Sequence, residues 1–253
     1  MTHDLFRLDG QVALVTGSSR GLGAAMAQAL AGAGADIILH DRCLAGDTEQ
    51  AIRGQSGVRT KCLVADLSDR AAAGRLADEA IAEMGHVDIL VNNAGIIRRA
   101  PAAEFSDVDW DDVIEINLTA VFRLCRAVGA QMVARGHGKI INIASLLSFQ
   151  GGVIVPSYAA AKAGVAQLTK SLANEWASKG VNVNAIAPGY MKTDNTKALV
   201  EDPVRYRQIT ERIPAGRWGE PRDLAGPVVF LASRASDYLQ GHVLVVDGGW
   251  MGR

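Results

Sequence analysis

The chain has 253 residues, of which 49% are hydrophobic and 21% charged, and its formal net charge is −1. This near-neutral balance gives no reason to expect nucleic acid or an anionic membrane as a partner. No apolar stretch approaches the ~20 residues that cross a bilayer, and the start, Met1-Thr2-His3-Asp4, lacks the basic and apolar segments of an export signal. The three cysteines, an odd number and far apart, indicate reduced thiols and a cytoplasmic location.

Short apolar runs alternate with helix-forming segments along the chain. Runs this apolar are typical of a parallel sheet that helices cover on both faces. We therefore expect a single doubly wound α/β domain over residues 1–253, with a long helix from about Asp107 to Arg135. The predicted strands are Val12–Thr16, Asp36–His40, Val58–Val64, Val87–Val91, Lys139–Ala144, Val181–Ala187 and His242–Val246, which gives a sheet of about seven strands.

A glycine-rich turn joins the first predicted strand to a predicted helix, Ala24–Ala33. Glycines there permit a tight turn, close approach of the backbone to a pyrophosphate, and close packing of helix on strand. The first amides of the helix would donate to phosphate oxygens. Such a turn can be only a turn, but its strand–turn–helix context favours a Rossmann-type dinucleotide site. The turn residues expected to contact the cofactor are Gly17, Ser19, Arg20, Gly21, Leu22 and Gly23.

An acidic residue, Asp41, closes the second predicted strand. A carboxylate at this point accepts a hydrogen bond from the ribose 2′-hydroxyl and repels a 2′-phosphate, which favours NAD over NADP. Arg20 and Arg42 favour the opposite, because either guanidinium could bind a 2′-phosphate. We expect NAD as the cofactor, with NADP as the alternative.

A second group of polar residues surrounds the end of the fifth predicted strand. Ser145 follows that strand, and the next predicted helix carries Tyr158 and Lys162 one turn apart on one face. An ammonium about 4 Å from a phenol would lower the phenol's pKa, near ~10 when free, by roughly three units. Tyr158 could then act as a general base while Ser145 binds the same substrate oxygen. On spacing alone, an ordinary surface i,i+4 pair is the better interpretation, because Tyr-x-x-x-Lys is a weak pattern.

Six motifs occur in a fixed order: Thr16-Gly17-x-x-x-Gly21-x-Gly23, Asn92-Asn93-Ala94-Gly95, Asn117, Ser145, Tyr158-x-x-x-Lys162 and Pro188-Gly189. Together they resemble the motif set of the short-chain dehydrogenase/reductase family, over nearly the whole chain. The resemblance implies a catalytic tetrad of Asn117, Ser145, Tyr158 and Lys162. Tyr158 would exchange the proton of the substrate hydroxyl, and Ser145 would orient its oxygen. Lys162 would lower the pKa of Tyr158 and bind the nicotinamide ribose, and Asn117 would position a water.

The resemblance also extends the cofactor site beyond the glycine-rich turn. The further contacts that it implies are Asp66, Leu67, Asn93, Ala94, Gly95, Tyr158, Lys162, Pro188, Gly189, Met191 and Thr193. For Asp66, a helix N-cap is an equally good interpretation. The family likeness further implies a homotetramer and a substrate flap over about residues 190–215.

Several loops resemble those of a sugar-acid branch of the family. They include Arg98-Arg99, Ser148–Gly152 and Arg217-Trp218-Gly219. The activity that they imply is oxidation of a secondary alcohol in a deoxy-keto sugar acid, with gluconate as the alternative substrate; Ser148–Gly152 favours the first. The candidate substrate contacts are Arg98, Ser145, Gln150, Tyr190 and Trp218, and an arginine could hold a carboxylate with a bidentate fork. The five histidines are isolated, so we expect no metal site.

A protein that senses NAD(H) without chemistry is the alternative from outside the enzyme class. It could keep the glycine-rich turn and Asp41 but would have little need of an intact tetrad, and fold alone does not decide between the two. Binding of NADH without turnover of any sugar acid, ketone or alcohol would support it.

Overall fold

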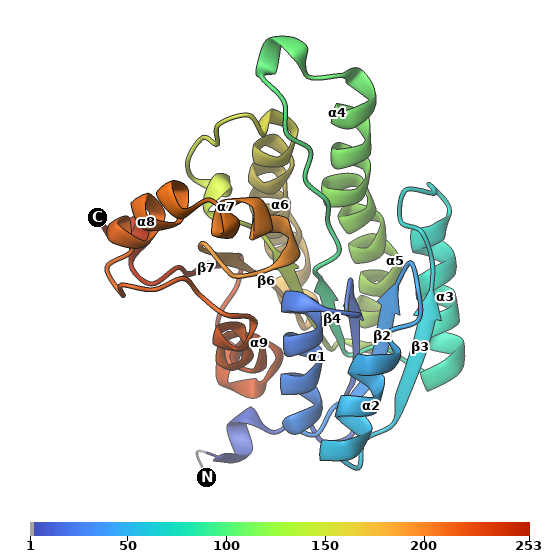
Figure 1. The fold of residues 1–253 in the computed structure, drawn as a ribbon. Coiled ribbons are helices and arrows are strands. Elements are labelled where there is room, and N and C mark those ends of the chain that lie inside the picture. Colours follow the sequence, from blue (N-terminus) through green and yellow to red (C-terminus); the bar gives the residue numbers. More distant parts are fainter. Residues whose placement is uncertain (1–2) are drawn as a thin grey trace.

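A seven-stranded parallel sheet forms the centre of the computed structural model, which describes residues 3–253 (Figure 1). The strands are β1 (Val12–Thr16), β2 (Asp36–Asp41), β3 (Thr60–Val64), β4 (Ile89–Asn92), β5 (Gly138–Ile143), β6 (Val181–Pro188) and β7 (Val243–Val246). Every neighbouring pair is parallel, in the order β3-β2-β1-β4-β5-β6-β7. The predicted doubly wound α/β fold is confirmed. Met1 and Thr2, part of the stretch searched for an export signal, lie outside the described residues.

Helices cover both faces of the sheet because its side chains are apolar on both. The helices are α1 (Gly21–Gly32), α2 (Gly46–Gln55), α3 (Ala72–Met84), α4 (Asp107–Ile114), α5 (Ala120–Arg135), α6 (Pro156–Trp176), α7 (Lys197–Glu201), α8 (Pro203–Arg212) and α9 (Ala225–Ala232). One core lies under α1, α2 and α9, and the other lies under α3, α5 and α6. In residues 3–253 we find no helix with the length and apolar character needed to cross a membrane.

The predicted long helix from Asp107 to Arg135 contains an irregular turn. α4 ends at Ile114, Glu115–Thr119 form a π-helical turn, and α5 begins at Ala120. The amide of Ala120 donates to the carbonyl of Glu115, one residue further back than in an α-helix. Such turns are frequent at functional sites. The fully buried Asn117 lies within this one.

The strand order reverses between β1 and β4, and ligands of such sheets bind beyond the carboxyl ends of the strands at this point. The loop into α4 and the segment with α7 and α8 both lie at that end of the sheet (Figure 1). α7 and α8 rest on a separate small core that includes Ile209, Trp218 and Trp250. The fold therefore brings the predicted motifs to one edge, with the predicted flap beside them.

Candidate active site

The turn between β1 and α1 is held in one shape by close backbone packing. Gly17 has a φ of 64° and Gly21 a φ of 57°, which is the left-handed region that favours glycine. A Cβ on Gly23 would lie 2.1 Å from the Gly17 carbonyl oxygen and 2.5 Å from Asn93 Nδ2. Asn93 Nδ2 donates to the carbonyls of Thr16 and Gly17 at 2.9 and 3.0 Å. The Asn93 side chain and the missing Cβ of Gly23 thus fix the turn at the N-terminus of α1.

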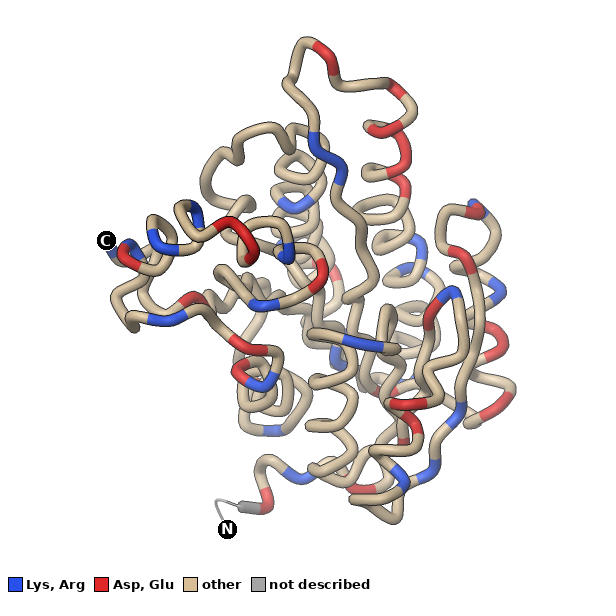
Figure 2. Tube along the Cα trace, in the orientation of Figure 1, with Lys and Arg blue, Asp and Glu red and all other residues tan. Residues whose placement is uncertain are grey.

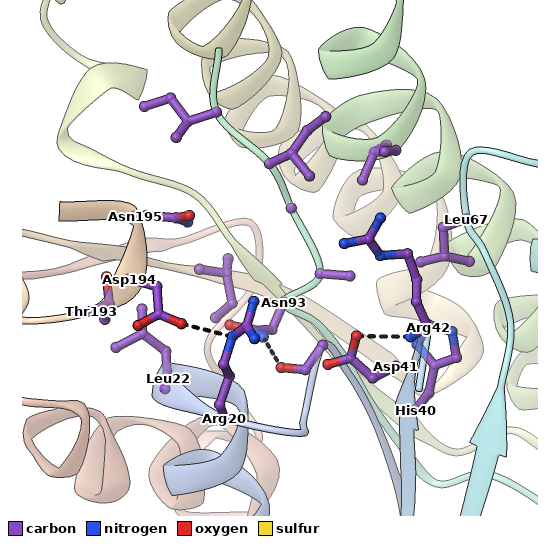
Figure 3. A pocket seen from close by; sticks show the side chains of 18 of the residues that line it. Arg20, Leu22, His40, Asp41, Arg42, Leu67, Asn93, Thr193, Asp194 and Asn195 are labelled. Carbon is purple, nitrogen blue, oxygen red and sulfur yellow. Dashed lines mark hydrogen bonds and ion pairs between the residues drawn. The ribbon is translucent and has the colours of Figure 1, made fainter. Parts of the chain in front are cut away.

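A cavity of about 310 Å³ opens beside this turn, at the carboxyl ends of the strands (Figure 3). The predicted residues that line it are Gly17, Arg20, Gly21, Leu22, Asp41, Asp66, Leu67, Asn93, Ala94, Gly95, Arg98, Tyr158, Lys162 and Thr193. They come from the ends of the first four strands, from α6 and from the start of the predicted flap. A glycine cradle, a helix N-terminus and an acidic residue along one elongated cavity fit a dinucleotide.

Asp41 is fixed at the far end of the cavity by its neighbours. One carboxylate oxygen accepts from the amide of Ser19 at 3.2 Å and from the Ser19 hydroxyl, and the other accepts from the amide of Arg42 at 2.8 Å. Burial acts to raise the pKa of Asp41, but these hydrogen bonds outweigh it and hold the pKa below its usual value. Asp41 is therefore a charged acceptor at neutral pH. Ser19, a predicted contact, acts here as its partner.

His40 and Arg42 line the same end of the cavity, although the sequence did not single them out as cofactor contacts for NAD. His40 is 2% exposed, and its Nε2 donates to the Ala65 carbonyl at 3.2 Å. Burial lowers the pKa of His40, so the ring is neutral at pH 7. Their position in the sequence, on either side of Asp41 at the end of β2, could have predicted that they line the cavity.

Ser145, Tyr158 and Lys162 come together at the other end. Ser145 ends the β5 segment as the N-cap of a short 3-10 helix, η4 (Leu146–Ser148), and its hydroxyl accepts from the Leu147 amide at 3.1 Å. Tyr158 and Lys162 lie in the first two turns of α6, which begins at Pro156. Lys162 Nζ donates to the Ile143 carbonyl at 2.6 Å and lies 5.7 Å from the centre of the Tyr158 ring.

The pKa of Tyr158 differs from the prediction. Burial raises the pKa of Tyr158 above its usual value, while a side-chain hydrogen bond with Ser145 and the positive charge of Arg99 act to lower it. Lys162, expected to be the acidifying group, bonds instead to the Ile143 carbonyl, and burial lowers the pKa of Lys162 to about 8. The prediction that Lys162 lowers the pKa of Tyr158 is therefore wrong for this structure. The groups that act to lower this pKa are Ser145 and Arg99.

Asn117 is tied to the main chain of the segment that lines the cavity. Its Nδ2 donates to the Ile96 carbonyl and its Oδ1 accepts from the Ile96 amide, both at 2.8 Å. A Cβ on Gly95 would lie 3.1 Å from the same Oδ1. The Asn117 side chain thus fixes residues 95–97 in place, and its expected role in positioning a water stays a prediction.

The chain is similar to known proteins over nearly its whole length. A family model described as "Enoyl-(Acyl carrier protein) reductase" matches residues 17–251. The 2-dehydro-3-deoxy-D-gluconate 5-dehydrogenase of Dickeya dadantii is 53% identical to the chain, with 100% of both covered. The chain belongs to the short-chain dehydrogenase/reductase family.

Two solved structures of the short-chain dehydrogenase/reductase family also match. A proposed 2-deoxy-D-gluconate 3-dehydrogenase from Agrobacterium tumefaciens, with bound NADP, is 53% identical, has a TM-score of 0.93 and aligns over 99% of this chain and 100% of its own. A gluconate 5-dehydrogenase from Burkholderia cenocepacia, in complex with NADP and tartrate, is 43% identical, has a TM-score of 0.95 and aligns over 100% of both chains. The chain is thus an oxidoreductase of a family that uses NAD(P).

The two adjacent arginines, Arg98 and Arg99, have different partners in this short-chain dehydrogenase/reductase. Arg98 lines the cavity, but its guanidinium pairs with Asp109 at 3.1 Å and Asp112 at 3.7 Å on α4. Figure 2 shows the acidic positions of α4 beside this basic segment. Arg99 is the more available cation: its Nη2 donates only to a backbone oxygen among the bonds described, that of Asn195 at 2.8 Å, and its charge acts on Tyr158.

Trp218 was expected to contact substrate, and the structure contradicts this. It is 1% exposed, stacks on Tyr206 with ring centres 5.4 Å apart, and donates to Thr210 Oγ1 at 2.9 Å. Tyr190 packs edge-on against the same ring. Gln150 accepts from the Trp250 indole at 3.4 Å. Four aromatic rings and Ile209 form one small apolar core, and the flap packs on this core.

Not all predicted contacts between residues 188 and 193, which comprise cofactor contacts and the substrate candidate Tyr190, line the main cavity. Gly189, Tyr190 and Met191 line a second cavity of about 250 Å³ next to Asp247 and Gly248. Pro188 is the last residue of β6, and Thr193 lines the main cavity at the start of the flap. In residues 3–253, no group of three or more His, Cys, Asp or Glu is arranged to hold a metal.

Proposed function

We propose that the protein transfers hydride between carbon 5 of 2-dehydro-3-deoxy-D-gluconate and a nicotinamide cofactor. The main support for this proposal is the 53% identity, over the full length of both chains, to an enzyme named for that reaction. The convergence of Ser145, Tyr158 and Lys162 beside a dinucleotide-shaped cavity supports it. Gluconate is the second candidate substrate, since a gluconate 5-dehydrogenase is 43% identical to the chain.

The chemistry assigns one task to each side chain. When bound, the nicotinamide ring supplies the position that accepts or gives the hydride. Tyr158 takes the proton from the substrate hydroxyl in oxidation and returns it in reduction. The Ser145 hydroxyl binds the same substrate oxygen, and the Lys162 ammonium binds the nicotinamide ribose. Asn117 keeps residues 95–97 against the cavity through its two bonds to Ile96.

NAD is the preferred cofactor in this proposal. The Asp41 carboxylate, held by Ser19 and Arg42, suits a ribose 2′-hydroxyl and would repel a 2′-phosphate. The similar Agrobacterium tumefaciens protein carries NADP, so NADP is the alternative. Arg20 is less available for a 2′-phosphate, since its side chain pairs with Asp194 at 2.8 Å (Figure 3).

The flap comprises residues 190–215 and closes over substrate between two arginines. Arg20 of the glycine-rich turn pairs with Asp194, and Arg99 of the opposite wall donates to the Asn195 carbonyl. The first contact joins the flap to the cofactor end of the cavity, and the second joins it to the wall beside the proposed substrate site. Closure of this kind excludes water and completes a site.

We expect Arg99, rather than Arg98, to bind the substrate carboxylate. Loss of a charge-assisted hydrogen bond costs roughly 1.5–3 kcal/mol, so Arg99→Ala should raise KM for the sugar acid about 10- to 150-fold. KM for the neutral polyol of the same length should change little. Arg98→Ala is the matched control, because Arg98 is already paired with α4. If Arg98→Ala has the selective effect and Arg99→Ala does not, the original expectation for Arg98 is correct.

A cytoplasmic homotetramer is the form that we propose. Cys43, Cys62 and Cys125 are unpaired, which supports a reducing compartment. Exposed apolar side chains on α4 and α5, including Trp110 and Phe122, support an interface on these helices. Sedimentation of the purified protein tests the assembly.

One assay tests the proposed function. The purified protein is given 2-dehydro-3-deoxy-D-gluconate, 2-deoxygluconate or gluconate with NAD or NADP, and the absorbance of reduced nicotinamide is followed. The highest kcat/KM should belong to 2-dehydro-3-deoxy-D-gluconate with NAD. A higher kcat/KM for gluconate would favour the second candidate, and NADH binding without any turnover would favour a sensing protein.

A further inference from the structure

The Ser148 hydroxyl connects the backbones of two residues that the proposed function places in the site. Its oxygen donates to the Lys162 carbonyl at 2.6 Å and accepts from the Ser145 amide at 3.3 Å. We propose that Ser148 is a positioning residue that sets the place of Ser145 relative to Tyr158 and Lys162. This inference rests on the roles proposed above for those three side chains.

The local structure explains why a tether is needed at this point. Ser145 has left the β5 ladder, and the η4 helix that follows contains only one turn. The Ser145 hydroxyl is the N-cap of that turn, while Ser148 closes the reciprocal bond to the Ser145 amide. Leu146 is buried in the aromatic core, but apolar packing is not directional. The hydrogen bonds of Ser148 are directional, and they therefore orient the Ser145 backbone relative to α6.

The bond to Lys162 connects η4 with α6 across the site. A carbonyl inside a helix already accepts from the amide four residues later, so the Ser148 hydroxyl adds a second donor from a separate element. The residue that receives it also carries the ammonium beside the Tyr158 ring. One side chain therefore fixes both the strand-end hydroxyl and the helix that bears the phenol.

Loss of this tether should affect the proton step more than cofactor binding. Small errors in the placement of reacting groups reduce rates strongly, whereas the glycine-rich turn and Asp41 are distant parts of the cavity. The groups that face Tyr158 are Ser145, Arg99 and, on its own helix, Lys162. A less well placed Ser145 would weaken the hydrogen bond that lowers the pKa of Tyr158, while the charge of Arg99 would remain.

Ser148→Ala tests the inference against three other variants. Ser148→Thr keeps the hydroxyl, and Tyr158→Phe identifies the signal of that phenol. Ser56→Ala is the matched control, since the Ser56 hydroxyl also donates to a backbone carbonyl, that of Ile52 at 3.0 Å, at the end of α2. The measurements are kcat and KM with the sugar acid, the pH midpoint of kcat/KM for oxidation, and a tyrosinate absorbance titration that needs no substrate.

For Ser148→Ala we expect kcat about tenfold lower, an unchanged KM for NAD, and both the kinetic midpoint and the Tyr158 titration moved to higher pH. Ser148→Thr should restore most of the activity and the wild-type midpoint. A Ser148→Ala protein that matches Ser56→Ala in kcat and leaves the Tyr158 titration in place overturns the inference. If wild-type protein turns over no sugar acid but the titration still moves, the proposed function fails and the positioning role stands.

Discussion

Replacing Tyr158 with phenylalanine is expected to lower kcat by roughly 10²- to 10⁴-fold, the usual contribution of general acid–base catalysis. The phenylalanine ring keeps the apolar contacts of α6, so the change removes one hydroxyl from a site where Ser145 is its hydrogen-bond partner. The measurement is the single-turnover rate of hydride transfer with cofactor and sugar acid both saturating. This rate excludes product release, which limits kcat in many enzymes.

NADH binding, followed by fluorescence, is the control for the Tyr158→Phe protein. We expect a dissociation constant within about twofold of the wild-type value, because the phenol is one of many groups along the cavity. Normal NADH binding with lost hydride transfer assigns the defect to the proton step. Hydride transfer at the wild-type rate would remove Tyr158 from the mechanism.

Gly23→Ala is expected to cost about 1–3 kcal/mol of unfolding free energy, as other overpacked positions do, and to weaken NADH binding about tenfold or more. The new Cβ would meet the Gly17 carbonyl oxygen at 2.1 Å and its carbon at 2.8 Å, both of which are backbone. The turn must therefore move, and the amides at the start of α1 move with it. Urea unfolding and NADH titration measure the two effects.

Gly32→Ala is the matched control, since Gly32 lies in the same helix and a Cβ there meets nothing within 4 Å. Alanine exceeds glycine in helix propensity by up to about 1 kcal/mol, so this variant should be as stable as the wild type or slightly more stable. NADH binding should be unchanged. Equal NADH affinity in the Gly23→Ala and Gly32→Ala proteins would show that the turn does not determine cofactor binding.

The sequence was sufficient to predict the sheet and the tightly packed glycine-rich turn, because both leave local patterns in the chain. Parallel strands buried on both faces leave apolar runs, and the strand ends predicted from those runs differ from the observed ends by at most two residues. A tight turn near backbone atoms leaves glycines, as at Gly17 and Gly23. Both signals are local, so one chain displays them without any knowledge of distant contacts.

The features that the sequence could not supply depend on contacts between distant segments. Arg98 and Arg99 are adjacent, and only the position of α4 determines that Arg98 pairs with it. Trp218 was expected to contact substrate because Arg217-Trp218-Gly219 resembles a loop of the sugar-acid branch, yet its ring stacks on Tyr206 and bonds to Thr210. Helix periodicity predicted the pair Tyr158 and Lys162 but not the Ile143 carbonyl that binds Lys162 Nζ. Likewise, the π-helical turn at Asn117 leaves no pattern in a run of helix-forming residues.

The most direct test of the central claim is the pH dependence of kcat/KM, measured for oxidation of the sugar acid and for reduction of its ketone. Oxidation needs the Tyr158 phenolate as base and reduction needs the phenol as acid, so kcat/KM should rise with pH in oxidation and fall with pH in reduction. Ser145 and Arg99 should keep the shared midpoint below the value that burial alone would set. Both slopes should vanish in the Tyr158→Phe protein. Slopes of the same sign in both directions, or slopes that persist without the phenol, would contradict the account.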